Sequence, residues 1–161
     1  MSENVREDSE NQKKTIALEN LPCAEWDDMY ALGYSDIDND HKELFKAINS
    51  YLEAVRSDAA PRITDDILEK MSDYAAEHFR REEDLMKRTF YKDYQHHKCC
   101  HDYFLDSVYK FRKRCQNGAD ISIDIAYFLP IWLRDHVLAL DMNMGVYLRS
   151  YDTDHVISNN D

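Results

Sequence analysis

Residues 74–101, YAAEHFRREEDLMKRTFYKDYQHHKCCH, contain four of the seven histidines of the chain. In this stretch Glu82 follows His78 by four positions, and His101 follows His97 by four positions. Side chains four apart on an α-helix lie one turn apart on nearly the same face. Each pair can therefore direct two ligand atoms at one point if both segments are helical.

The apolar residues on both sides of these pairs recur at spacings of three and four, which predicts helices. Four helices are expected, from about 38 to 57, from 63 or 64 to 88, from 93 to 115 and from 122 or 123 to 148. With only three glycines and three prolines, long helices and short connections are favoured over a β architecture. The predicted fold is all-α, an up-down-up-down four-helix bundle.

Local residues suggest where these helices begin and break. Asp38 or Asn39 is expected to cap the first helix and Thr64 the second, because short polar side chains accept hydrogen bonds from the first helical N–H groups. Pro61 is expected to break the chain between them. Pro130 lies inside the fourth apolar pattern, where its missing N–H is expected to end or kink the first turns.

The bundle domain is predicted to span residues 20–151, between a disordered or loosely held tail at 1–19 and a C-terminal tail at 152–161. Residues 20–38 have no sustained helical period and contain a proline and a glycine, so an extended N-terminal arm is expected across the bundle. The side chains expected to pack down from this arm are Trp26, Met29, Tyr30, Leu32 and Tyr34.

Three further residues extend the ligand set to all four helices. His41 lies on the inner stripe of the first helix, and His136 and Asp141 lie on that of the fourth. His136 and Asp141 are five positions apart, about 140° on an ideal α-helix, so a regular helix does not aim them at one target. A π-turn returns to the same face after about five residues, which predicts a π-bulge between them. The neighbouring acids Glu83 and Asp84 are expected to point outward.

A single histidine on an apolar face is more often a hydrogen-bonded core residue than a ligand. The combination is harder to explain in that way, because burying five imidazoles and two carboxylates without partners costs several kcal/mol for each group. Such a set suits iron or zinc better than magnesium or calcium. Seven ligands are too many for one ion, whereas two carboxylates that each bridge two ions use them all. A bridging oxide or hydroxide is expected to complete the charge balance.

Composition excludes several other functions. A net charge of −12 repels phosphate backbones, so nucleic acid is not an expected partner. No apolar run approaches the roughly 20 residues of a membrane span, and the N-terminus lacks the apolar core of a signal peptide, so a cytoplasmic location is expected. Cys23, Cys99, Cys100 and Cys115 form no C-x-x-C motif and are expected to be free thiols.

Four segments carry a resemblance to a known family: WDDMYALGYSDIDNDHKELFKAIN at 26–49, HFRREEDLM at 78–86, HHKCCHDYF at 96–104 and WLRDHVLALD at 132–141. Over about residues 24–150 the chain resembles the hemerythrins, specifically the bacteriohemerythrin type. The resemblance implies a non-haem diiron centre that binds O2 reversibly, and hence an oxygen carrier, storage or delivery protein rather than an enzyme. The alternatives are O2, redox or nitric oxide sensing at the same irons, or a diiron peroxidase or oxidase activity.

The resemblance also implies individual roles. His97, His101 and His136 would hold one iron, His41 and His78 the other, and Glu82 and Asp141 would bridge them. The second iron, with two histidines, would keep the open position for O2. The residues that match the pocket lining of the family are Trp26, Leu44, Phe79, Trp132, Leu133 and Val137; none is ionisable, which favours binding over catalysis. The protein that receives the oxygen is not indicated.

The chain departs from the family pattern at a few positions. Cys99 and Cys100 lie between two expected ligands and are interpreted as inert packing thiols, with a redox-sensing pair as the alternative. Ala139 is small and Met144 replaces a common aromatic residue, so a roomier pocket is expected.

Overall fold

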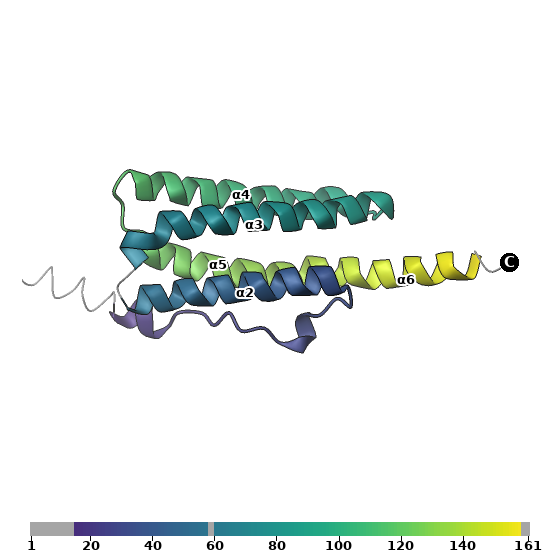
Figure 1. Cartoon of the computed structure of the whole chain (residues 1–161), viewed down its shortest axis with the longest axis horizontal. Helices are drawn as coiled ribbons and strands as arrows, with labels where there is room; N and C mark the ends of the chain where they lie inside the picture. The colour runs from purple at the N-terminus through teal and green to yellow at the C-terminus, as the bar shows by residue number, and fades with distance from the viewer. Residues whose placement is uncertain (1–14, 58–59, 159–161) are drawn as a thin grey trace, which may run out of the picture.

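The computed structural model describes residues 15–57 and 60–158, and within them it forms an antiparallel four-helix bundle without strands (Figure 1). This arrangement confirms the predicted all-α, up-down-up-down fold. The fourth helix of the bundle is one long continuous segment, in which a π-helical turn separates two α-helical parts. The elements are α2 (Ser35–Arg56), α3 (Ala60–Arg88), α4 (Tyr94–Gln116), α5 (Ser122–His136), η2 (Val137–Asp141) and α6 (Met142–Ser158).

The N-terminal arm follows α2 along the outside of the bundle and contains one short 3-10 turn, η1 (Asp28–Tyr30) (Figure 1). Asp27 caps this turn, since its carboxylate accepts a hydrogen bond from the Met29 N–H at 2.8 Å. Leu32 is completely buried, as expected for an arm that packs on the bundle. The expectation for Met29 was wrong: its side chain is 60% exposed, because the turn directs it to solvent.

Residues 15–19, the part of the predicted loose N-terminal tail that the structure describes, are helical. Leu18 is partly buried against the main core, and the Tyr127 hydroxyl donates to the Ala17 carbonyl at 3.1 Å. These residues therefore contact the bundle. Residues 1–14 lie outside the described part of the chain.

The start of α2 differs from the prediction. The helix begins at Ser35 with Tyr34 as the N-cap residue, so neither Asp38 nor Asn39 caps it. Asp38 instead lies in the first turn and accepts hydrogen bonds from the backbone N–H groups of Leu32 and Gly33, at 2.7 and 3.1 Å. Asp38, which was expected to cap the helix, thus stabilises the turn that connects the N-terminal arm to α2.

The start of α3 also lies earlier than predicted. The helix begins at Ala60, and Pro61 sits in its first turn, where a missing N–H removes no helical hydrogen bond. Thr64 is therefore inside the helix rather than at its cap, and its hydroxyl donates back to the Ala60 carbonyl at 2.7 Å. Pro61 opens the second helix instead of breaking the chain before it.

The fourth helical segment continues past the proline that was expected to end or kink it. Pro130 is buried inside α5 and does not end the helix, which runs unbroken from Ser122 to His136. At the other end α6 continues to Ser158, beyond residue 151 where the domain was predicted to end, and it projects past α3 and α4 (Figure 1). None of the described helices is both long enough and apolar enough to cross a membrane.

The apolar core is divided into two clusters. The larger one includes Phe45, Phe104 and Leu129, and the smaller one, towards the α3–α4 turn, includes Met86 and Met144. On each helix the residues of the two clusters are separated by the buried polar residues described next. The bundle therefore contains a polar layer between two apolar ones.

Candidate metal centre

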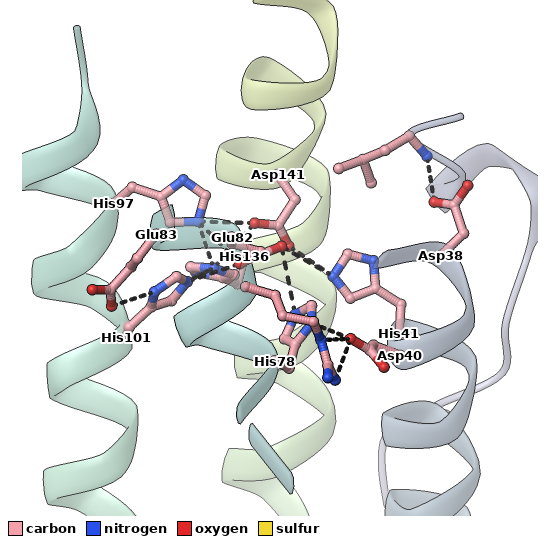
Figure 2. A network of polar contacts seen from close by, with 12 residues as sticks. Asp38, Asp40, His41, His78, Glu82, Glu83, His97, His101, His136 and Asp141 are labelled. Atoms are coloured by element: carbon pink, nitrogen blue, oxygen red, sulfur yellow. Dashed lines mark hydrogen bonds and ion pairs between the residues drawn. The ribbon is translucent and has the colours of Figure 1, made fainter. Parts of the chain in front are cut away.

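All seven predicted ligand residues meet in this polar layer (Figure 2). The side chains come from all four helical segments of the bundle, as the inner-face pattern predicts. Their exposed fractions are at most 5%, the value of His136. The full set is His41 on α2, His78 and Glu82 on α3, His97 and His101 on α4, His136 at the end of α5 and Asp141 at the end of η2.

The turn between His136 and Asp141 is a π-helix over Val137–Asp141, which confirms the π-bulge predicted from the five-residue spacing. Its effect is local, since regular α-helix precedes and follows it. The wider turn places Asp141 Oδ1 3.3 Å from His136 Nε2. One helix can thereby contribute two side chains to one point despite the irregular spacing.

Three imidazoles converge on one side of the layer. His136 Nε2 lies 3.1 Å from both His97 Nε2 and His101 Nε2. Two carboxylate oxygens face the same point: Asp141 Oδ1 is 2.9 Å from His97 Nε2, and Glu82 Oε2 is 3.2 Å from His101 Nε2. These five residues form the larger of the two groups in the described part of the chain that could hold a metal ion.

Two imidazoles face the opposite side. His78 Nε2 lies 3.5 Å from Glu82 Oε1, and His41 Nε2 lies 3.7 Å from the same oxygen. The second oxygen of Asp141, Oδ2, is 3.3 Å from His41 Nε2. Both carboxylates therefore divide their oxygens, with one oxygen of each towards the three-histidine side and the other towards the two-histidine side.

Several polar atoms of this layer lack the hydrogen-bond partners that buried polar atoms normally have. Both oxygens of Glu82 and of Asp141 and both ring nitrogens of His41 are buried without a hydrogen bond. Such atoms are rare in folded proteins because each costs free energy. The ring nitrogens of His97 and His101 each lie 3.1 Å from that of His136, so the three imidazoles are close enough together to hold one ion. The residues present fit a metal centre.

The charges in the layer are strongly coupled. Burial alone disfavours a charged His41, but the carboxylates of Asp141 and Glu82 outweigh it and raise the pKa of His41 to about 10. Burial would raise the pKa of both carboxyl groups, and repulsion by Asp141 would also raise that of Glu82, yet the surrounding histidines hold both pKa values below their usual range. Both carboxylates are thus negative at neutral pH and able to bind a cation.

Asp40, which the sequence analysis did not single out, supports His78 from behind. Its Oδ2 lies 3.3 Å from His78 Nδ1 and accepts hydrogen bonds from the Arg81 guanidinium at 2.8 and 2.9 Å. The Tyr74 hydroxyl donates to the other oxygen at 2.9 Å. A carboxylate on the far nitrogen of a ligand histidine fixes the ring and makes it a stronger donor. The only signal in the sequence was an acid next to His41 on the inner side of the first helix.

Glu83 contacts the far ring nitrogen of His101, as Asp40 contacts that of His78. It therefore points inward, contrary to the expectation that it points outward. Its Oε1 lies 3.3 Å from His101 Nδ1, and its side chain is only 15% exposed. The position follows Glu82 directly, and the close approach of α4 to α3 brings His101 over it (Figure 2). Asp84, as expected, faces outward and pairs with Arg80 at 2.8 Å.

Aromatic rings cover the three-histidine side. Phe79 stacks on His101 with 3.9 Å between ring centres, and Trp132 stacks on His136 at 4.4 Å. Leu44, Leu133 and Val137 are buried in the main core. Trp26 is half-buried on the outside of α2, where its ring contacts Tyr30 and Phe45; its role as a pocket residue stays a prediction.

The positions that depart from the family pattern fall on different surfaces. Cys99 is exposed and Cys100 half-buried, and all four cysteines are free thiols. Met144 is completely buried in the smaller apolar cluster. Ala139 is exposed and borders an outer cavity beside His136, so its small side chain enlarges that cavity rather than the buried layer.

Comparisons with known proteins agree with this geometry. Residues 32–145 match the family model of the hemerythrin HHE cation binding domain. The chain is 32% identical over 112 residues to a bacteriohemerythrin of Pseudomonas aeruginosa, covering 70% of this chain and 72% of that one. It is 34% identical over 122 residues to a bacteriohemerythrin of Clostridium acetobutylicum (72% and 94% covered) and 31% identical over 117 residues to a hemerythrin-like protein of Naegleria gruberi (73% and 87%). No solved structure matches significantly. The match and the buried cluster together support binding of non-haem iron.

Proposed function

We propose that this chain, which belongs to the hemerythrin family, binds O2 reversibly at a non-haem diiron centre. The observation that carries the proposal is the division of carboxylate oxygens. Glu82 and Asp141 each turn one oxygen towards the three-histidine side of the layer and the other towards the two-histidine side. A carboxylate placed in this way is suited to bridge two ions.

In this proposal one iron is held by His97, His101 and His136, and the other by His41 and His78. Glu82 and Asp141 bridge the two, together with an oxide or hydroxide. The irons would supply the electrons that O2 requires to bind. The side with two histidines has one ligand fewer, and we assign O2 to that side.

The residues around the centre favour binding over catalysis. Leu44, Phe79, Leu133 and Val137 have exposed fractions of 0 to 5%, so they exclude water from the layer. Loss of O2 as superoxide or peroxide needs protons, and a dry surrounding limits their supply. Carriage, storage or delivery of oxygen is therefore favoured over a peroxidase or oxidase activity.

The experiment is a cycle of reduction and oxygenation on the purified full-length chain. We expect two irons per chain and, after anaerobic reduction, a visible absorption band that appears with O2 and disappears when O2 is removed. The band should return over repeated cycles. One-way conversion to a ferric form with release of peroxide would refute reversible binding and favour an oxidase.

A substitution tests the bridging role directly. Glu82→Ala should lower the iron content below two per chain, because it removes one ligand from each ion. The matched control is Glu77→Ala, on the same helix with its side chain 50% exposed, which should keep full iron content. Retention of two irons in Glu82→Ala contradicts the assignment.

A further inference from the structure

We propose that a cavity on the outer surface, against the three-histidine side of the metal layer, binds one small, neutral, aromatic molecule. The cavity has a volume of about 580 Å³ and lies between α4 and the α5–η2 segment. Sites for small organic molecules usually measure about 300–1,000 Å³. The hollow is thus large enough for a molecule of two or three rings.

The lining favours a flat apolar ligand. The apolar side chains that face the cavity are Tyr103, Tyr127, Phe128, Ile131, Trp132 and Leu140. Tyr103 is 58% and Ile131 39% exposed, which is unusual for large apolar side chains grouped together on a surface. A planar molecule against these rings would remove that surface from water and gain ring-to-ring contacts.

Charge argues for a neutral ligand with one polar end. The ionisable groups of the lining include His96 and Asp135. Arg134 donates to Asp135 at 2.7 Å, so the charge of that carboxylate is already compensated. An anion would also meet the field of a chain with net charge −12. A hydroxyl or amine on an aromatic ring could instead hydrogen-bond to His96 or Asp135.

This site is separate from the proposed position of O2. The cavity is bordered by His136, on the three-histidine side, and by the Trp132 ring that stacks on it at an interplanar angle of 13°. O2 is assigned to the opposite side, at His41 and His78. The Trp132 ring would therefore separate a ligand in the cavity from the polar layer, and the ligand would not occupy that layer.

Titration of the iron-loaded, full-length chain with N-phenyl-1-naphthylamine, a neutral fluorescent probe, tests the proposal. We expect saturable binding of one probe per chain by calorimetry. The chain has two tryptophans, so a Trp26→Phe background leaves Trp132 as the single donor for energy transfer to the probe. Metal-free protein should give the same stoichiometry, which keeps this test independent of O2 binding.

Two substitutions inside the cavity have matched controls outside it. Ala139→Leu fills the hollow and Ile131→Lys places a charge in it, and each should weaken probe binding about tenfold or more, since tenfold corresponds to about 1.4 kcal/mol. Ala76→Leu, exposed on α3, and Val146→Lys, 58% exposed on α6, make the same changes away from the lining and should leave binding unchanged. The anionic 1-anilinonaphthalene-8-sulfonate should bind more weakly than the neutral probe.

Three outcomes overturn the proposal. Absence of saturable binding excludes the site, and equal binding to Ala139→Leu and Ala76→Leu places the probe elsewhere. A dimer in sedimentation that Ile131→Lys dissociates would show that a second copy of the chain covers this face instead. Equal affinity for the anionic probe would refute the neutral ligand class.

Discussion

At the scale of single residues, Asp40 ties two helices together behind the metal layer. It lies on α2 beside His41 and accepts hydrogen bonds from Tyr74 and Arg81 on α3, with His78 Nδ1 on the same carboxylate. Burial would raise the pKa of Asp40, but its hydrogen bonds with His78 and Tyr74 outweigh burial and lower it. The carboxylate is therefore charged at neutral pH and holds the His78 ring with Nε2 towards Glu82.

Asp40→Ala should weaken iron binding by about 10- to 100-fold, the usual effect of losing a carboxylate behind a ligand histidine. Asp40→Asn should lose less, because an amide oxygen can still accept from His78. The measurement is iron retained against a competing chelator. Asp106→Ala removes an exposed acid paired with Lys110 and serves as the control. Equal retention in Asp40→Ala and Asp106→Ala would leave Asp40 without a positioning role.

At the scale of elements, Tyr51 joins three helices at the end of the bundle away from the α3–α4 turn. Its hydroxyl lies 3.3 Å from Thr64 Oγ1 on α3 and 3.3 Å from the Ser122 carbonyl at the start of α5. The side chain is completely buried. Burial raises the pKa of Tyr51 to about 12.

This shift predicts a loss of stability at alkaline pH. The folded state keeps the phenol proton to higher pH than the unfolded state, so the stabilisation is complete below pH 10 and declines as the pH rises towards 12. Tyr51→Phe should lower the free energy of unfolding by about 1 kcal/mol at neutral pH, the net value of a hydrogen bond. Between pH 10 and 12 the variant should lose less stability than the wild type, because it has no phenol to titrate. Urea unfolding at a series of pH values measures both. Parallel pH curves for the two proteins would contradict the prediction.

The contact between the arm and α6 depends on a glycine. A Cβ at Gly145 would lie 3.1 and 3.2 Å from two side-chain atoms of Leu32, which is tighter than ordinary packing. Leu32 cannot shift freely, because Asp38 binds its N–H and Arg149 donates to its carbonyl. The close approach of Leu32 to the α6 backbone therefore requires glycine at this position.

Gly145→Ala should therefore destabilise the protein by about 1 kcal/mol, because overpacking exceeds the gain of about 1 kcal/mol in helix propensity. Asn143→Ala, at an exposed position two residues earlier, lacks the contact and should be neutral or slightly stabilising. Thermal unfolding of both variants gives the comparison. A Gly145→Ala protein as stable as Asn143→Ala would mean that the arm adjusts without cost.

The elements also show which features of the fold the sequence could predict. The helical pattern and the five-residue spacing of His136 and Asp141 depend on nearby residues, and the four helices and the π-turn are present. The roles of Glu83 and Asp38 depend on partners far along the chain or on a backbone turn, and the sequence alone assigned them wrongly. Pro61 was misread because a proline that breaks one helix can equally begin the next.

At the scale of the whole molecule, the polar layer interrupts the core between its two apolar clusters. The seven side chains of this layer could be predicted because each falls on the inner apolar face of its helix, and two of the helices carry a pair of them four residues apart. The outer cavity could not, since Trp132 and Tyr103 are brought together only by the packing of α5 on α4. The interruption makes the stability of the bundle depend on what fills the layer.

Removal of iron should consequently destabilise the whole bundle while leaving it helical. Without metal the carboxylates of Glu82 and Asp141 keep only histidines as partners, and their oxygens have no hydrogen bonds. An ion that binds only the folded state adds about 2.7 kcal/mol when its free concentration is 100 times the dissociation constant. We expect the free energy of unfolding of the anaerobic iron(II) protein, and with it the urea midpoint, to fall after chelation, the free energy by that order. Far-UV circular dichroism at low urea should change little. Glu82→Ala, which lacks a ligand to both ions, should show a smaller difference. Identical midpoints with and without iron would mean that the layer is stable by itself, and the unpartnered atoms would then need another explanation.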